Sequence, residues 1–245
     1  MKKNEIAISV NDLHVYYRDM NRFSLKKWSK EKGSGKIFKA VKGVSFEVPK
    51  GQILGICGKN GSGKSTLLRA ISGIFSPDKG SINLHGNTIS LLSIGVGFQK
   101  QLTGYENIYL SGMLLGYNKE QIDAKVDEII EFSELGDFVY KPVRSYSSGM
   151  YSKLAFSITA VLETDIMLID EVLSVGDIHF KEKSYNKMKE LISDSNRTVV
   201  IVSHSSKTIT ELCDKVIWLH EGLIRDEGDP ERIMNEYEAF MREEQ

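Results

Sequence analysis

Four short apolar runs punctuate the chain, and each is followed by polar or glycine-rich sequence. They cover residues 6–10, Ile53–Cys57, Ile166–Ile169 and 199–202. The last three are almost continuously apolar, as expected of parallel strands that are buried on both faces of a sheet. Because helical patterns separate them, the sequence predicts an α/β fold with a mainly parallel sheet and covering helices.

A helical region interrupts this alternation between residues 101 and 163, where no strand pattern occurs. Asn118 and Gln121 have the spacing of a capping box, which satisfies the first backbone amides of a helix. We therefore expect a helical lobe inserted into the α/β core. The helix that begins here is predicted to have one apolar face, formed by Ile122, Val126, Ile129 and Ile130.

Composition and net charge exclude few classes of function. The chain has 245 residues, 41% hydrophobic and 27% charged, with a net charge of -1, which gives no electrostatic reason to expect nucleic-acid binding. Nine Lys or Arg gather between Arg18 and Lys42 against two acids, and nine acids gather from Glu221 onward against three Arg. Residues 226–245 are predicted to form an acidic amphipathic helix. Its apolar face would consist of Ile233, Tyr237 and Phe240.

The sequence predicts neither a secretory signal nor a membrane span. The N-terminal segment has only a five-residue apolar run, and no stretch approaches the roughly 20 apolar residues that cross a bilayer. A transport function would therefore require a second polypeptide to form the pore. Cys57 and Cys213 show no metal-ligand spacing and are predicted to be small core residues in a reducing compartment.

A glycine-rich loop after the second apolar run is the strongest chemical signal. Residues 58–66, GKNGSGKST, fit the phosphate-loop pattern G-x-x-x-x-G-K-[ST]. Glycines let the backbone turn tightly and point N–H groups at phosphate oxygens, and the dipole of a following helix favours an anion. We expect Lys64 to bridge the β- and γ-phosphates of a nucleotide and Ser65 to bind Mg²⁺. The predicted nucleotide contacts here are Gly58, Lys59, Asn60, Gly61, Ser62, Gly63, Lys64, Ser65 and Thr66.

Two further predicted strands end in residues that the same ligand would use. Asp170 and Glu171 follow the third apolar run, and His204 follows the fourth. Ligands of open α/β sheets bind at the carboxyl ends of the strands, so these side chains are expected to meet the phosphate loop. Asp170 is predicted to help hold Mg²⁺, Glu171 to orient or deprotonate the attacking water, and His204 to contact the γ-phosphate. The alternative for the acidic pair is a cap for the following helix.

These motifs together resemble the ATP-binding subunits of ABC transporters over nearly the whole chain. Residues 146–150, YSSGM, are similar to the family's LSGGQ signature, and residues 174–177, SVGD, stand at the position of its D-loop. The resemblance implies that Tyr17 stacks on adenine, with Tyr16 or Phe38 as alternatives, and that Gln99 is the Q-loop residue that touches Mg²⁺.

The resemblance implies a RecA-like P-loop core with an inserted helical subdomain, the fold of an ABC ATPase. In this chain the core would comprise residues 1–100 and 164–225, with a basic insertion at 18–36. The helical signature subdomain would comprise residues 101–163, and the acidic helix 226–245 would follow the core.

A head-to-tail homodimer is also implied. Ser147 is a good N-cap, and the amides that follow it would form a second anion site at the start of a helix. Ser147 and Gly149 of one chain would then cover the γ-phosphate held by the other chain, giving two shared ATP sites. Ser148 in place of glycine and Met150 in place of glutamine depart from the family's signature.

A narrower similarity links LTGYENIYL, YSSGM, DEVLSVGD and the basic insertion to exporters of lipid-linked O-antigen, capsule or teichoic acid chains. It implies a peripheral ATPase at the cytoplasmic face of the cell membrane, with separate transmembrane permease subunits and a lipid-linked glycan as substrate. Gln99 departs from this subgroup, which often has His there. The basic insertion, with Phe23 and Trp28, is predicted to face anionic lipid or the pyrophosphate of the cargo, or to be a solvated loop.

Three other functions share some of these motifs. One is an ABC subunit for another substrate, and a second is an ABC ATPase that acts on ribosomes or nucleic acid. Proteins of the second kind usually carry paired ATPase domains or long coiled-coil arms, which the sequence lacks. A GTPase would need an NKxD motif, whereas residues 118–121 read NKEQ, and neither a GTPase nor a small-molecule kinase explains YSSGM. An exporter ATPase is therefore favoured.

Overall fold

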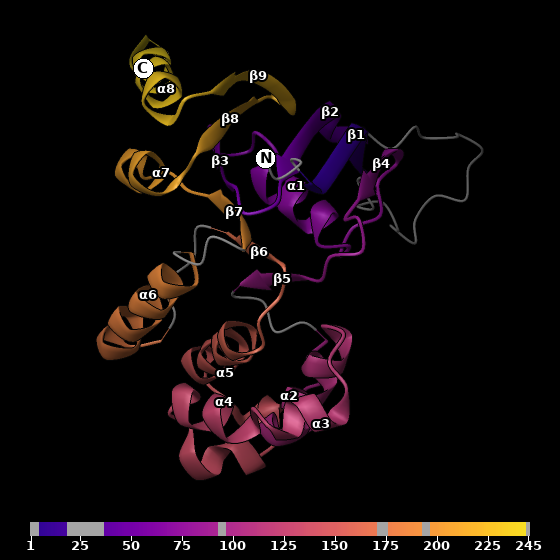
Figure 1. The fold of residues 1–245 in the computed structure, drawn as a ribbon, viewed down its shortest axis with the longest axis vertical. Coiled ribbons are helices and arrows are strands. Elements are labelled where there is room, and N and C mark those ends of the chain that lie inside the picture. Colours follow the sequence, from indigo (N-terminus) through magenta and orange to yellow (C-terminus); the bar gives the residue numbers. More distant parts are fainter. Residues whose placement is uncertain (1–4, 19–36, 93–96, 171–175, 193–196, 244–245) are drawn as a thin grey trace, which may run out of the picture.

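A six-stranded sheet forms the centre of the computed structural model, which describes residues 5–18, 37–92, 97–170, 176–192 and 197–243. The strand order is β5 (Ile89–Leu92), β6 (Ile166–Ile169), β7 (Thr198–Val202), β3 (Ile53–Cys57), β8 (Lys215–His220) and β9 (Leu223–Gly228). The three predicted strands β6, β7 and β3 are neighbours in this sheet (Figure 1), and all neighbouring pairs are parallel except β8 with β9.

The prediction of a mainly parallel sheet is confirmed, but the first apolar run lies outside that sheet, in a second one. This sheet is antiparallel and consists of β2 (Ile37–Pro49), β1 (Ile6–Arg18) and β4 (Lys79–Asn83). Its middle strand continues well beyond residue 10, because a bulge at Asp12, with φ of 43°, absorbs the polar pair Asn11-Asp12 that looks like a turn in the sequence. Buried Leu13 and Val15 then resume the inward face.

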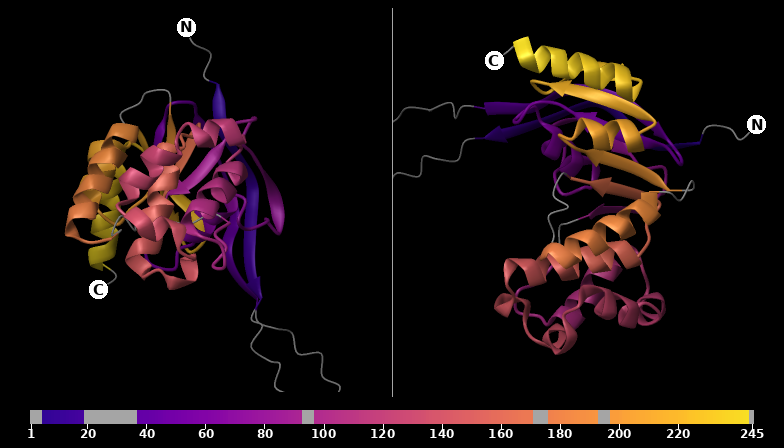
Figure 2. Two further views of the ribbon diagram at one scale, coloured as in Figure 1. Left: turned by 90° about the horizontal axis from the view of Figure 1, so that it is seen from below. Right: turned by 90° about the vertical axis from the view of Figure 1, so that its left-hand side faces the viewer.

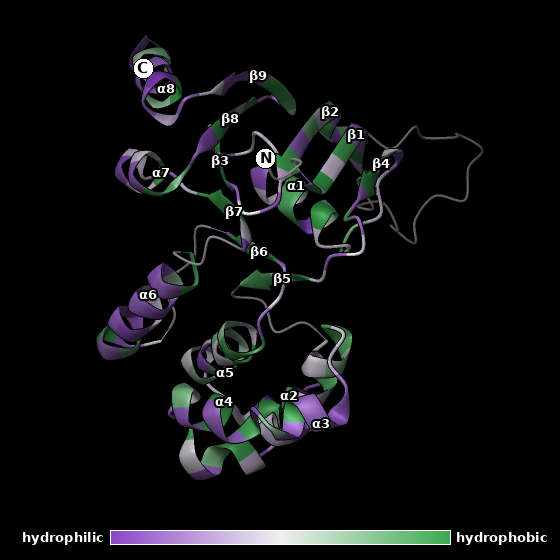
Figure 3. Cartoon of the chain, viewed as in Figure 1, coloured by the Kyte–Doolittle hydropathy of each residue, from purple (hydrophilic) through white to green (hydrophobic). Residues whose placement is uncertain are grey.

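Helix α1 (Lys64–Ile71) joins the two sheets. Its Leu67 and Leu68 are fully buried. They belong to one hydrophobic cluster that contains residues of β1 and β2 from the antiparallel sheet and of β3 and β6 from the central sheet. This packing holds the start of α1, and therefore the end of the phosphate loop, at the carboxyl end of β3. Figure 3 shows the contrast between the hydrophobic strands of the central sheet and the largely hydrophilic α6 (Ile178–Ile192).

A group of helices lies at the far end of the molecule from the antiparallel sheet (Figures 1 and 2). The Asn118 and Gln121 capping box is confirmed, with both reciprocal bonds at 2.9 Å. The prediction of a single helix after this capping box is wrong, since the chain turns at Ala124 and Lys125. Ile122 and Ile129 are nevertheless buried in one hydrophobic cluster. The helices are α2 (Gly104–Leu114), α3 (Lys119–Asp123), α4 (Val126–Ser133) and α5 (Ser148–Val161), with 3₁₀ turns at Gly136–Tyr140 and Val143–Ser145.

Helix α8 (Pro230–Glu243) packs on the opposite end of the central sheet, beside α7 (Ser206–Leu212). Its predicted apolar face is present: Ile233 is buried, and the Tyr237 and Phe240 rings pack against Trp218 of β8. The helix begins later than residue 226, because β9 extends to Gly228. Among the described helices, none combines the length and apolar character that a bilayer crossing requires.

Candidate nucleotide site

The glycines of the phosphate loop are required by its backbone. Gly58, Gly61 and Gly63 have φ angles of 145°, 80° and 106°, which side chains strongly disfavour. A Cβ on Gly58 would collide with the Leu219 carbonyl, and one on Gly63 with the Ala40 carbonyl. The loop therefore packs closely on neighbouring strands while it turns from β3 into α1.

The loop has donors that suit an anion. Helix α1 starts after Gly63 with no side-chain cap and no acid in its first turn, so its first amides are suited to an external acceptor. Ser62 Oγ is buried without a hydrogen-bond partner in the described part of the chain. The buried Lys64 ammonium donates to the carbonyls of Gly58 at 2.6 Å and Lys59 at 3.0 Å, which holds it over the loop. These features fit the phosphates of a nucleotide.

The ends of three strands meet at this loop, as expected for an α/β site. Ser65 Oγ donates to Asp170 Oδ1 at 3.4 Å, which connects the start of α1 to the end of β6. His204, just beyond β7, lines a pocket of about 200 Å³ together with Asn60, Gly61, Gly63, Lys64, Ser65 and Thr66. Glu171 lies outside the described residues.

Ser65 and Asp170 offer the hard oxygen atoms that Mg²⁺ prefers. Mg²⁺ usually takes only one or two protein oxygens and completes its shell with water and substrate phosphates. The donor pair therefore fits a magnesium ion that arrives with a nucleotide.

Two of the three aromatic candidates for adenine stacking lie at the loop. Phe38 lines the loop pocket and is 58% exposed. Tyr17 lies beside Phe38, and its hydroxyl is 3.0 Å from Thr66 Oγ1. Tyr16 instead contacts His14 and Lys39. The geometry therefore leaves Tyr17 and Phe38 in place for stacking, and the role of either remains a prediction.

Gln99 is not brought to the loop pocket. Its side chain is exposed, and its backbone is held by Asn107, which accepts from Gln99 N at 2.7 Å and donates to Gln99 O at 3.1 Å. Residues 93–96, which precede it, lie outside the described part of the chain. A role for Gln99 at Mg²⁺ therefore stays a prediction.

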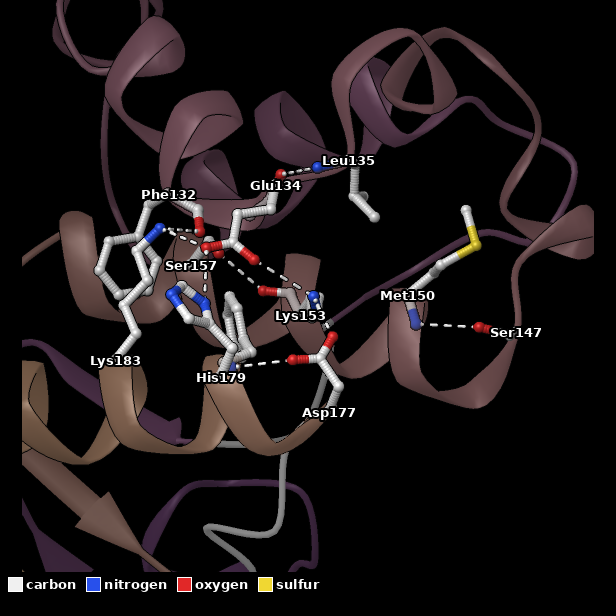
Figure 4. Close-up of polar contacts among 12 residues, drawn as sticks. Phe132, Glu134, Leu135, Ser147, Met150, Lys153, Ser157, Asp177, His179 and Lys183 are labelled. Atoms are coloured by element: carbon white, nitrogen blue, oxygen red, sulfur yellow. Dashed lines mark hydrogen bonds and ion pairs between the residues drawn. The ribbon is translucent and has the colours of Figure 1, made fainter.

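The signature residues form a separate pocket. Ser147 caps α5, and its hydroxyl accepts from Met150 N at 3.2 Å. A pocket of about 420 Å³ lies here, lined by Ser147, Gly149, Lys153 and Asp177 among others, and it shares no residue with the loop pocket. The signature and the phosphate loop of one chain therefore lie at separate pockets. The sequence did not point to Lys153, because its partners come from distant segments (Figure 4).

Both cysteines are free and belong to the packing. Cys57 is fully buried immediately before the loop, and burial raises its pKa to about 12. Burial raises the pKa of Cys213 to about 12 as well. Both thiols therefore stay protonated at neutral pH, and neither supplies a nucleophile to the site.

Comparison with known proteins adds independent information. The sequence profile of the ABC transporter family matches residues 41–174. An O-antigen export system ATP-binding protein, RfbB, of Klebsiella pneumoniae is 42% identical, and the match covers 84% of each chain. A teichoic acids export ATP-binding protein, TagH, of Enterococcus faecalis is 47% identical over 83% of this chain. The chain spans only 45% of that protein, and 45% of the RfbB of Myxococcus xanthus.

Solved structures share the fold. The dimeric, ADP- and Pi-bound ATP-binding cassette MJ0796 superposes with a TM-score of 0.68 at 21% identity, over 91% of this chain and 98% of that one. An ATP-binding subunit of an ABC transporter superposes with a TM-score of 0.70 at 20% identity, over 94% and 93% of the two chains. At these identities the likeness bears on the fold alone.

Proposed function

Because the chain belongs to the ABC transporter family, we propose that it hydrolyses ATP to power the export of a lipid-linked polysaccharide or teichoic acid. The observation that carries the ATPase activity is the meeting of Lys64, Asp170 and His204 at the ends of three strands. The proposed substrate class rests on relatives named for O-antigen and teichoic acid export. ATP hydrolysis by the purified chain is the first test.

The proposed mechanism assigns each residue one task. The loop amides and Lys64 bind the β- and γ-phosphates. Ser65 and Asp170 would hold Mg²⁺, which would neutralise phosphate charge when bound. Glu171 accepts the proton of the water that attacks the γ-phosphorus, and His204 contacts the γ-phosphate. The bond from the γ-phosphorus to the bridging oxygen then breaks, which leaves ADP and phosphate.

We further propose that two copies act together at the cytoplasmic face of the membrane, on separate transmembrane subunits. The separation of the signature pocket from the loop pocket supports this arrangement, since one chain alone does not place Ser147 over its own loop. ATP would then stabilise the closed dimer, and hydrolysis would release it.

Replacing Ser147 with arginine tests the dimer. We expect Ser147→Arg to abolish hydrolysis and to leave ATP binding by the monomer unchanged, because the signature contacts only the partner's nucleotide. Steady-state hydrolysis measures the first effect. Nucleotide titration, at a concentration that keeps the chain monomeric, measures the second. Ser81→Arg, on the exposed strand β4, is the control and should retain activity. If monomeric Ser147→Arg lost ATP binding to the same extent as hydrolysis, this would contradict the assignment of Ser147 to the partner's nucleotide.

All of the basic insertion after Arg18, residues 19–36, lies outside the described residues, and its proposed role rests on the sequence. Each Lys or Arg near anionic headgroups contributes about 1 kcal/mol to membrane binding. Neutralising Lys26, Lys27 and Lys30 together is therefore expected to weaken binding to anionic liposomes or to reduce glycan export, with basal ATPase activity unchanged. Unaltered export together with unaltered liposome binding would show that the segment is only a solvated loop.

A further inference from the structure

Three helix ends meet beside the signature turn, and Lys153 lies between them (Figure 4). Its ammonium on α5 is 2.8 Å from Asp177 Oδ2, at the start of α6, and 3.3 Å from Glu134 Oε2, at the end of α4. The Lys153 side chain is only 14% exposed and lies over the Phe180 ring, 4.9 Å from its centroid. One cation of α5 thus joins the end of α4 to the start of α6.

Each carboxylate is itself held in place. Asp177 Oδ1 accepts from Phe180 N at 3.0 Å, and the hydrogen bond from Lys153 is the largest cause that lowers the pKa of Asp177 to about 2. Glu134 also accepts from Lys183 Nζ at 3.0 Å. Burial alone would raise the pKa of Glu134, but its hydrogen bonds from Lys183 and Lys153 outweigh burial and lower it. Both acids are therefore charged at neutral pH.

The residues around the Lys153 ion pairs are also closely packed. A Cβ on Gly176, where φ is 74°, would come within 2.9 Å of Lys153 Cε and 3.1 Å of Phe180 Cβ. A Cβ on Gly149, in the signature itself, would be 3.9 Å from Gly176 Cα. The Lys153 side chain therefore packs closely on the backbone before α6, and the signature turn lies beside that backbone.

The contacts also connect the helical lobe to the core. Phe180 of α6 packs edge-to-face on Phe156 of α5 and on Phe132 of α4, with ring centroids 6.1 and 5.8 Å apart. Phe156 and Phe180 belong to the hydrophobic cluster beneath β6 and β7. The ion pairs of Lys153 lie at the edge of this aromatic contact, so they orient the start of α5 relative to the strands that end at the loop pocket.

We propose that Lys153 is a positioning residue, which aims the signature turn of α5 at the nucleotide of a second copy by binding Glu134 and Asp177 at once. The inference rests on the proposed ATPase function. An exposed ion pair contributes little, but this ammonium is mostly buried, shared by two carboxylates and packed on a ring. A displacement of about 1 Å at a reacting centre can lower a rate by about 100-fold, so the position of Ser147 matters more for hydrolysis than for folding.

The test uses Lys153→Met, which keeps the length of the apolar stem, and Lys153→Arg, which keeps the charge. We expect Lys153→Met to lower kcat by about 10- to 100-fold, with ATP binding by the monomer unchanged. It should also weaken ATP-driven dimerisation in a Glu171→Gln background. Lys153→Arg should restore both properties, and Lys187→Met, which removes an ion pair elsewhere on α6, is the control and should change neither.

Asp177→Asn gives a second variant should Lys153→Met fold poorly. It is expected to lower kcat in the same range. The double variant Lys153→Met/Asp177→Asn should have a kcat no lower than that of the less active single variant, since both changes remove the Lys153–Asp177 contact. The inference would be overturned if Lys153→Met or Asp177→Asn kept the kcat and the dimerisation of the unmodified chain. It would also be overturned if Lys153→Arg lost as much kcat and dimerisation as Lys153→Met. The unmodified chain is assayed alongside, and its failure to hydrolyse ATP would count against the proposed function alone.

Discussion

Replacing Lys64 with alanine is expected to abolish ATP hydrolysis, with a loss of at least about 100-fold, since removing one preorganised charge-stabilising donor has an effect of this size. The buried ammonium is held over the loop by two backbone carbonyls, so it is in place before a nucleotide binds. Its removal also weakens ATP binding, because the β- and γ-phosphates lose a charged hydrogen-bond donor. Steady-state hydrolysis and nucleotide titration measure the two losses.

The control for this change is Lys79→Ala, which removes an exposed lysine from β4, away from the loop. It should hydrolyse and bind ATP as the unmodified chain does. Thermal denaturation of Lys64→Ala separates loss of function from loss of fold, since the alanine leaves the Gly58 and Lys59 carbonyls without this donor. Near-normal turnover in a folded Lys64→Ala protein would mean that the loop does not bind the reacting phosphates.

Glu171→Gln is expected to slow hydrolysis by about 10²- to 10⁴-fold while ATP binding persists, because the amide cannot accept the proton of the attacking water. Glu171 follows Asp170, whose carboxylate accepts from Ser65 at the end of β6. Since binding survives and hydrolysis does not, the variant should accumulate as an ATP-bound dimer. Size measurement with and without ATP and Mg²⁺, together with a single-turnover assay, tests both consequences.

Glu182→Gln is the matched control, because it makes the same chemical change on the exposed surface of α6. It should hydrolyse ATP normally and should not accumulate as a dimer. A Glu171→Gln protein that binds ATP and remains monomeric would speak against the head-to-tail dimer, and one that hydrolyses ATP normally would remove Glu171 from the mechanism. The two results are independent and bear on different parts of the proposal.

Local sequence determined the centre of the fold and the phosphate loop. A strand buried on both faces must be continuously apolar, and this is why β3 and β6 begin and end where their apolar runs do. The loop could be predicted because its backbone needs glycine at fixed positions: Gly58 and Gly63 have positive φ angles and no room for a side chain. The capping box at Asn118 is local in the same sense.

Half-buried elements were harder to predict, because their boundaries depend on neighbours. Strand β2 alternates apolar and polar residues only over part of its length, and its pairing with β1 contains several register shifts. The polar pair Asn11-Asp12 ends the apolar run in the sequence. Strand β1 nevertheless continues past this pair, because it stays paired with β2 on both sides of the bulge. Likewise, Ile122 and Val126 share a cluster although the helix breaks between them.

Only the tertiary structure decided which distant side chains meet. Ser65 and Asp170 are 105 positions apart, and their contact exists because α1 begins and β6 ends at the same edge of the sheet. Lys153 has no sequence pattern that relates it to Glu134 or Asp177, since the three residues come from separate helices that aromatic packing brings together. Periodicity and turn chemistry act over a few residues, whereas such contacts depend on how whole elements pack, and the alignment of the signature turn is therefore a property of the folded chain.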